Sequence, residues 1–290
     1  MNETESPRAW RGHEDLYAQF CEQLLNLTTS NGWERWLQFA NKFRKYSYAN
    51  LLLIMAQRPE ATHVGGKRFW EKLGREVNPD AKPLKIWCPY QRKVVDPDEP
   101  EADPRKVTGW FLGDVYDVAE TTGVELPQPV DLLEGSSPEG LQEGLLEQIG
   151  DLGFAFELVP AGELHGANGD CSHTLKKIRV REDLSPAQIT KTTAHELAHA
   201  LMHEQVSGYR ADRGLCEQEA ESVAFLVCGG LGLDTSEYSL GYVASWATGN
   251  GEIDIEALRG RLGKLAKRVQ TTAAKISGGL EQSLNGISLA

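Results

Sequence analysis

The chain has 290 residues, of which 40% are apolar and 25% charged, and its formal net charge at pH 7 is −12. These values are ordinary for a soluble globular protein, and the length predicts two domains with separate cores. No apolar run is long enough to span a bilayer, and the N-terminus lacks the basic and apolar regions of a signal peptide. The five cysteines are odd in number and show no paired spacing. We therefore expect free thiols, a cytoplasmic location and no membrane partner.

The first 130 residues are predicted to form an α+β domain in which helices precede a small sheet. Apolar residues at helical spacing indicate helices over residues 14–29, 33–43, 51–57 and 65–74. Segments rich in strand-forming residues follow over residues 75–77, 84–90 and 108–118. The acidic, proline-rich residues 96–104 are interpreted as a solvated, mobile loop between the last two strands.

Basic and aromatic residues concentrate in this first domain. Between Trp33 and Lys93 the sequence holds 13 Lys and Arg against 5 Asp and Glu, so this segment carries +8 and the rest of the chain −20. The segment up to Tyr90 also holds ten of the 23 aromatic residues. Lys and Arg neutralise phosphates and exposed rings stack on unpaired bases, as in sequence-tolerant binders of single strands. The candidate DNA-binding residues are Arg35, Lys42, Lys45, Tyr46, Tyr48, Lys67, Arg68, Arg75 and Tyr90, whereas Trp33, Trp36 and Trp70 are expected to pack in a core.

The second domain is predicted to begin where the composition becomes turn-like, over residues 127–137. This boundary gives domains of residues 1–130 and 131–290. The expected helices cover residues 137–152, the region after Pro186, the region around 217–227, and residues 238–248 and 253–276. Strands are expected over residues 154–159 and 174–181, the second in a position where a protease could pair with a substrate backbone.

A His-Glu-x-x-His motif lies within the helix that follows Pro186. The residues Ser185-Pro186-Ala187-Gln188 are typical of a capping box with proline at the first helical position. Residues four apart share a helix face, so His195 and His199 can direct two imidazole nitrogens at one metal ion. Glu196 lies beside them and is the candidate catalytic base, able to take a proton from water.

Two histidines do not complete a four-coordinate zinc site, so a third ligand is expected. The downstream helix offers Glu217, Glu219 and Glu221. Glu217 and Glu221 share a face, so one could ligate the ion while the other hydrogen-bonds a ligating histidine. On residue spacing alone, the choice among the three acids stays open.

The N-terminal part carries Tyr48-x-Asn50-x-Leu52 and then Gly65-x4-Trp70-x3-Gly74-Arg75-x-Val77. This spacing resembles that of the N-terminal domain of a known family, the ArdC-type antirestriction proteins. The resemblance implies a module that binds single-stranded DNA, and it adds Asn50 to the DNA-binding candidates. The second half is similar to the family's ImmA/IrrE-type zinc metallopeptidase domain. There the pattern Glu-x-x-Ala falls on Glu217 and favours it as the third ligand, with Glu221 hydrogen-bonding a ligating histidine.

Two features depart from the family's pattern. Residues 78–83 replace a basic, glycine-bearing loop, and Glu221 stands where related helices often carry Asp or Asn. The expected function is that of an antirestriction-type protein of a mobile genetic element, with single-stranded DNA as partner, Zn²⁺ as cofactor and a protein or peptide as substrate. A DNA-binding regulator is one candidate for that substrate. The alternative is a non-catalytic protein that shields single strands and keeps a structural or vestigial zinc site.

Overall fold

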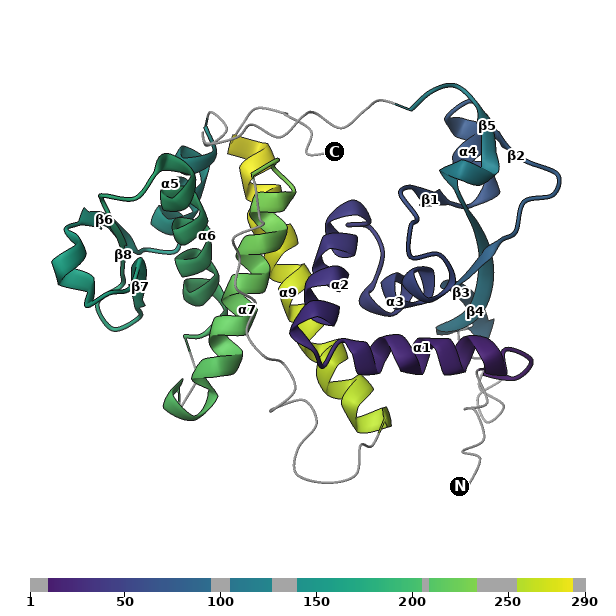
Figure 1. Cartoon of the computed structure of the whole chain (residues 1–290), viewed down its shortest axis with the longest axis horizontal. Helices are drawn as coiled ribbons and strands as arrows, with labels where there is room; N and C mark the ends of the chain where they lie inside the picture. Colours follow the sequence, from purple (N-terminus) through teal and green to yellow (C-terminus); the bar gives the residue numbers. More distant parts are fainter. Residues whose placement is uncertain (1–9, 95–104, 127–139, 205–208, 234–254, 284–290) are drawn as a thin grey trace. The chain divides into compact units, whose positions relative to one another are not determined.

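The computed structural model describes residues 10–94, 105–126, 140–204, 209–233 and 255–283. The chain folds into two compact units of mixed helices and sheets, which confirms the expected α+β class (Figure 1). The first unit comprises residues 1–25 and 45–126, and the second comprises residues 26–44 and 127–290. The boundary expected between residues 130 and 131 lies outside the described ranges.

In the residues of the first unit that the structure describes there are three α-helices, and α3 is the most buried of them. These are α1 (Glu14–Asn26), α3 (Tyr48–Gln57) and α4 (Lys67–Lys72). The start of α3 is set by Ser47, whose side chain accepts a hydrogen bond from the backbone N–H of Asn50. This cap starts the helix at Tyr48, three residues before the predicted start. Helix α3 is apolar on nearly all sides, as expected for a helix in a core, and its fully buried residues are Leu51, Leu52, Leu53 and Ile54.

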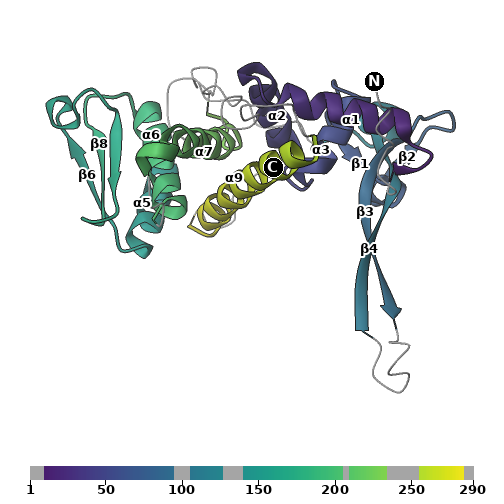
Figure 2. The same ribbon diagram turned by 90° about the horizontal axis from the view of Figure 1, so that it is seen from below.

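The sheet of the first unit is dominated by one long hairpin (Figure 2). Its strands are β3 (Leu84–Val94) and β4 (Arg105–Asp117), both longer than predicted toward the residues that join them. The short strand β1 (Val64–Gly65) completes the order β1-β4-β3, and β2 (Arg75–Val77) pairs with β5 (Thr121–Gly123). The predicted acidic loop at residues 96–104 lies outside the described residues.

Two amide side chains of α3 bind the outer edge of β3. Because β3 lies at the edge of its sheet, some of its backbone groups point away from β4 and need other partners. The Asn50 amide accepts from the Trp87 N–H at 2.8 Å and donates to the Trp87 carbonyl at 2.9 Å. Gln57 makes the same pair of bonds with Lys85, at 2.8 and 2.9 Å. The helix thus satisfies the free edge of the strand.

The second unit combines a small sheet, which lies to one side of the unit (Figure 1), with helices from both ends of the chain. Its helices are α2 (Ser30–Lys42), α5 (Leu141–Asp151), α6 (Pro186–Met202), α7 (Tyr209–Gly229) and α9 (Ile255–Ser283). The sheet order is β6-β8-β7, in which β6 (Ala155–Val159) runs parallel to β8 (Lys177–Arg181) and β7 (Gly169–Ser172) runs antiparallel to it. The helix predicted over residues 238–248 lies outside the described ranges.

Helix α2 packs within the second unit, although its sequence lies among the first 130 residues. Its Trp33 indole donates a hydrogen bond to the Ser222 hydroxyl of α7 at 2.9 Å. The amide of Asn41 also donates to the Phe225 carbonyl of α7, at 3.5 Å. Trp33 and Trp36 are fully buried, as predicted, and Trp70 is fully buried in the first unit. In the part of the chain that the structure describes, no helix combines the length and apolarity needed to cross a membrane.

The amide contacts between α3 and β3 generate a stability prediction. We expect Asn50→Ala and Gln57→Ala each to lower the free energy of unfolding by about 1–3 kcal/mol, because each leaves backbone groups of β3 without a partner. Gln91→Ala is the matched control: its amide is exposed on the same strand, and we expect a change within about 0.5 kcal/mol. Urea unfolding followed by circular dichroism measures all three. Equal effects from the three substitutions would contradict the role assigned to Asn50 and Gln57.

Candidate metal centre

Helix α6 carries the His-Glu-x-x-His motif at the position that the sequence predicts. The capping box is formed: the Ser185 hydroxyl accepts from the Gln188 N–H, and the Gln188 side chain accepts from the Ser185 N–H. Pro186 occupies the first turn, and the helix continues to Met202. The motif histidines lie one turn apart, and their Nε2 atoms are 3.1 Å from each other.

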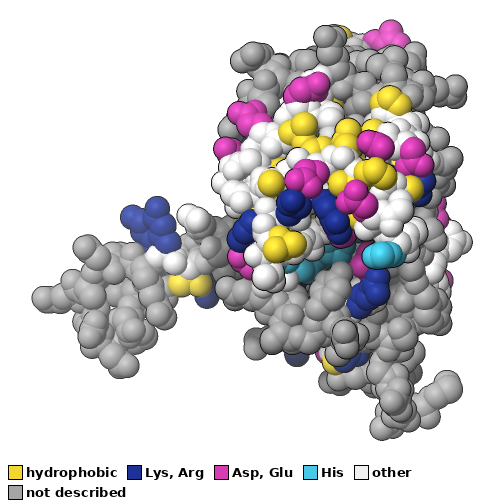
Figure 3. Space-filling view, turned by 90° about the vertical axis from the view of Figure 1, so that its left-hand side faces the viewer, with side chains coloured by type: hydrophobic (Ala, Val, Ile, Leu, Met, Phe, Trp, Pro, Cys, Tyr) yellow, Lys and Arg dark blue, Asp and Glu magenta, His cyan; other side chains and the backbone are white. Residues whose placement is uncertain are grey.

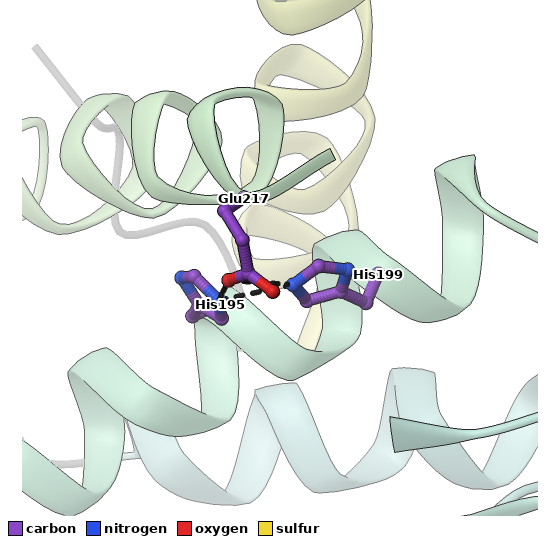
Figure 4. A group of neighbouring side chains, drawn as sticks. All are labelled: His195, His199 and Glu217. Carbon is purple, nitrogen blue, oxygen red and sulfur yellow. Dashed lines mark hydrogen bonds and ion pairs between the residues drawn. The ribbon is translucent and has the colours of Figure 1, made fainter. Parts of the chain in front are cut away.

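Helix α7 contributes a carboxylate to the same point (Figure 4). The Glu217 Oε2 atom lies 3.4 Å from His195 Nε2 and 3.5 Å from His199 Nε2. Three donors placed about 2.0–2.1 Å from a tetrahedral zinc ion lie roughly 3.3 Å from one another. The three donor atoms therefore have the chemistry and the spacing that a divalent metal requires. In Figure 4 the two rings and the carboxylate point toward one another from the two helices.

The other two acids considered as ligands make different contacts. Glu221 Oε2 lies 2.9 Å from His195 Nδ1, the nitrogen that faces away from His199. Glu219 Oε2 lies 3.0 Å from Nε2 of His203, and its side chain is 4% exposed. Of the three acids, Glu217 is the one that groups with both His195 and His199.

The acidic groups and imidazoles of this cluster perturb one another's protonation. Burial lowers the pKa of His195, but hydrogen bonds with Glu217 and Glu221 outweigh it and raise this pKa to about 10. Hydrogen bonds with His195 and His199 hold the pKa of Glu217 well below its usual range. Burial lowers the pKa of His199, which favours its neutral form. The carboxylate of Glu217 and the neutral ring of His199 are the protonation states that bind a metal.

Glu196 is a buried acid between the two motif histidines in the sequence. Its residue is 6% exposed, and burial raises the pKa of its carboxyl to about 7. The edge strand β7 passes close to it: a Cβ added at Gly169 would lie 2.9 Å from Glu196 Oε1 and 2.7 Å from Thr192 Cγ2. Glycine at this position therefore leaves room for the carboxyl group. A carboxyl group that titrates near neutral pH is suited to exchange protons with water.

A cleft of about 790 Å³ opens over the cluster. Figure 3 shows histidine side chains at the base of a hollow on this face, with basic and acidic side chains around it. One wall is β7, the edge strand of the sheet, and the other side is formed by α6 and α7. Besides the cluster itself, the lining includes Asp170, Cys171, His173, Lys191 and Arg213.

Sequence reasoning missed two histidines near the cluster. His203 was not among the candidate residues, yet it is 4% exposed and its Nδ1 lies 2.9 Å from His199 Nδ1. The signal was its spacing of four from His199. His173 follows β7, and its Nε2 lies 3.2 Å from the carbonyl oxygen of His199. No local pattern marks His173, because the contact joins the turn after β7 to a helix residue 26 positions away.

The DNA-binding candidates divide into exposed and internal side chains. The exposed ones are Arg35 and Lys42 on α2 of the second unit, and Lys45, Lys67, Arg68 and Tyr90 in the first unit. Of the internal ones, Tyr46 and Arg75 donate hydrogen bonds to backbone carbonyls of the first unit. Tyr46 donates to the Val64 carbonyl at 2.7 Å, and burial raises the pKa of its hydroxyl to about 12. Arg75 donates to the Thr121 carbonyl at 2.9 Å and to the Val124 carbonyl.

Tyr48 and Asn50 have a packing role in this structure. Both are 8% exposed, and the Asn50 amide is bonded to the backbone of Trp87. The interpretation of Tyr48 as an exposed ring for stacking does not fit its burial. Exposed rings occur instead on β4, where Trp110 is 60% exposed and Phe111 50% exposed, opposite the strand that carries Tyr90. These two rings were not among the candidates, because they lie beyond the segment from Trp33 to Lys93.

Two protein families match separate parts of the chain. Residues 14–113 match the N-terminal domain of anti-restriction factor ArdC. Residues 159–228 match the IrrE N-terminal-like domain, Peptidase_M78, and this range includes the whole His-His-Glu group. Among curated proteins, an uncharacterized protein of Bacillus anthracis is 26% identical over 88% of this chain. The chain spans about half of that relative, 49% of its length.

Two crystal structures of the antirestriction ArdC protein from plasmid R388 share the fold. The metal-free structure has a TM-score of 0.54 at 19% identity, over 84% of this chain and 87% of that chain. The Mn(II)-bound structure has a TM-score of 0.51 at 17% identity, over 84% and 86%. A match to the ArdC N-terminal domain, a match to the IrrE-like Peptidase_M78 domain and the fold of ArdC together support an ArdC-type protein.

Proposed function

We propose that the second unit is a zinc-dependent peptidase and that the first unit binds single-stranded DNA, as expected of an antirestriction protein of a mobile element. The observation that carries the peptidase proposal is the group of His195, His199 and Glu217 beside the buried carboxyl of Glu196, at the base of an open cleft. The R388 ArdC protein has a Mn(II)-bound structure, which supports a divalent metal in this fold. Two imidazoles and one carboxylate form a ligand set of catalytic zinc sites.

The proposed chemistry divides among the residues of the cleft. His195, His199 and Glu217 would hold the metal, and a zinc ion there would lower the pKa of water and polarise the scissile carbonyl. Glu196 accepts the proton of the attacking water and delivers it to the leaving amine. Its raised pKa suits both steps, because a group that titrates near 7 gains and loses a proton readily at neutral pH.

The edge strand β7 would position an extended substrate, in place of the predicted strand over residues 174–181, because β8 is the central strand and both of its edges are paired. Its residues Gly169, Asp170 and Cys171 line the cleft, and β8 pairs with only one of its edges. An extended peptide that adds to a free strand edge is bound through backbone hydrogen bonds, which are independent of its sequence. We therefore expect a peptide backbone to align along β7 with its scissile bond over the His-His-Glu group.

The DNA-binding proposal is supported by the β3–β4 hairpin. Lys93 and Lys106 are direct cross-strand partners, and Arg92 and Val107 form the adjacent pair. Like charges opposite each other destabilise a hairpin unless an anion neutralises them. The nearby exposed ring of Trp110 can stack on a base. Basic side chains that can contact phosphates and an exposed ring that can stack on a base together make this hairpin the single-strand-binding element that we propose for the first unit.

The rival function is a DNA-protecting protein without peptidase activity. In that case the metal would be structural, and a structural zinc site needs a closed fourth position and no base. The open cleft and the buried Glu196 favour the peptidase.

Metal content and activity together separate ligands from the base. We expect one zinc per chain, lost in His195→Ala, His199→Ala and Glu217→Ala but retained in Glu196→Gln, with peptidase activity absent or at least about 10²-fold lower in all four. Metal analysis and a library of quenched fluorescent peptides measure the two properties. Full zinc in Glu217→Ala would transfer the ligand role to another acid. Zinc-loaded wild-type protein that cleaves nothing, while its DNA binding is intact, would favour the rival function.

Glu196 also predicts a pH dependence of stability in the metal-free chain. Burial raises the pKa of Glu196 in the folded chain to about 7 from its ordinary value of 4.5, so its contribution to the free energy of unfolding is fully present below pH 4.5 and is lost as pH rises through 7. Glu196→Gln removes this titration. We therefore expect the variant to become more stable than wild type as pH rises from 5 to 8, by up to about 3 kcal/mol. Urea unfolding with a chelator present measures it, and parallel pH profiles would contradict the buried state of Glu196.

The hairpin generates the DNA-binding prediction. We expect the full chain to bind single-stranded DNA. The logarithm of its binding constant should fall with the logarithm of the salt concentration, with a slope of roughly −0.7 for each phosphate neutralised. Trp110→Ala should cost about 1–3 kcal/mol of binding free energy, and Lys93→Glu with Lys106→Glu should weaken binding across all sequences. The matched controls in the second unit are Leu175→Ala, an exposed apolar residue, and Lys264→Glu with Lys267→Glu on α9. Fluorescence anisotropy at several salt concentrations is the measurement. Losses as large in the controls would exclude a specific role for the hairpin.

A further inference from the structure

A series of polar side chains in contact with one another starts at Nδ1 of His199, on the opposite side of the ring from the Nε2 atom that faces the metal site. His199 Nδ1 lies 2.9 Å from His203 Nδ1, His203 Nε2 lies 3.0 Å from Glu219 Oε2, and Glu219 Oε1 lies 3.1 Å from Arg268 Nε. The side chains of His203 and Glu219 are 1% and 4% exposed, whereas that of Arg268 is 51% exposed. This series of side-chain contacts thus runs from α6 through α7 to α9 in the second unit.

The chemistry of these groups determines where the protons lie. An ionised carboxylate only accepts hydrogen bonds, so His203 must donate to Glu219 from Nε2. A neutral imidazole carries one N–H, so the Nδ1 of His203 is then an acceptor. The bond between the two Nδ1 atoms therefore requires the proton on His199. With its proton on Nδ1, His199 presents the lone pair of Nε2 toward His195 and Glu217.

We propose that His203, Glu219 and Arg268 are positioning residues that hold His199 in the orientation and tautomer needed to bind the metal. The inference rests on the proposed metal site and extends it to residues outside the His-His-Glu group. Metal-bound histidines generally donate their second N–H to a carboxylate, a carbonyl or water, and this contact raises their affinity for the metal. Here the contact passes through a second imidazole before it reaches a carboxylate.

Arg268 forms an ion pair with Glu219 at the far end of this series of side chains. A buried carboxylate without a partner is costly, and Arg268 supplies the pairing cation from α9. Its Nη2 also donates to the carbonyl of Met202 at 3.3 Å, next to His203 in the chain. One guanidinium thus binds both the acid that orients His203 and the backbone that precedes it.

Helix α7 then supports both metal-facing histidines. Glu221 contacts Nδ1 of His195 directly, and Glu219 reaches Nδ1 of His199 through His203. This arrangement supplies a matched control, because Glu221→Gln alters the other histidine by the same chemical change as Glu219→Gln. The two acids act through separate rings.

A thermodynamic cycle on zinc affinity tests the proposal. Zinc alone is titrated against a competing fluorescent chelator, with the full chain at fixed pH. We expect His203→Leu and Glu219→Gln each to weaken affinity about 10–100-fold, and the double variant to bind no more weakly than His203→Leu. In the double variant Glu219→Gln with Glu221→Gln, the fold-losses of zinc affinity from the two single variants should instead multiply. Arg268→Gln should weaken zinc affinity less than Glu219→Gln does. Combined with Glu219→Gln, it should cause no further loss of zinc affinity. If His203→Leu fails to fold, Glu219→Gln and Arg268→Gln, compared by circular dichroism with wild type, carry the test.

The protonated nitrogen provides a second readout that a packing role would not change. In the zinc-loaded, ¹⁵N-labelled protein we expect the N–H of His199 on Nδ1, and its exchange with solvent to accelerate in Glu219→Gln. Three outcomes would each overturn the proposal while leaving the metal site in place. They are unchanged zinc affinity in these variants, fold-losses of zinc affinity that multiply in His203→Leu with Glu219→Gln, and a proton on Nε2 of His199. A wild-type chain that does not bind zinc would overturn the metal site itself and this inference with it.

Discussion

The packing of α6 against α7 is the constraint on which the candidate site depends. Each helix buries small residues four positions apart, Ala194 and Ala198 on α6 and Ala220 and Ala224 on α7, all with no exposed surface. Helix axes approach more closely when the residues between them are small. A carboxylate on α7 can then reach imidazoles on α6, as the separations of 3.4 and 3.5 Å from Glu217 show. A wider separation of the two helices would move apart donors that must lie about 3.3 Å from one another.

The same interface holds an unusual number of buried polar groups. Glu196, His199, His203 and Glu219 are each at most 6% exposed. Buried charges and imidazoles are tolerated where each one has partners, and here the partners come from α6, α7 and α9 together. Such a network constrains the rotamers of its members, which is what a metal site requires. Burying these groups costs free energy, and the raised pKa of Glu196 reflects that cost.

The first unit is organised by a different use of polar side chains. Asn50 and Gln57 bond the backbone of β3 and thereby fix a core helix to the base of a long hairpin. The distal part of that hairpin leaves rings such as Trp110 exposed. A firmly anchored base and an exposed distal end suit an element that contacts an extended ligand, because anchoring reduces the entropy lost on binding.

Local patterns in the sequence determined the elements, and the tertiary structure decided which distant residues meet. The capping box at Ser185 and the spacing of His195 and His199 are encoded within a few residues, so the motif helix and the alignment of its histidines were predictable. Three glutamates at alternate positions of α7 could not be distinguished in this way. Their contacts depend on how α7 and α9 are rotated against α6, which is set by long-range packing. The same reason explains why α2 joins the second unit, why Tyr48 is buried and why His203 meets Glu219.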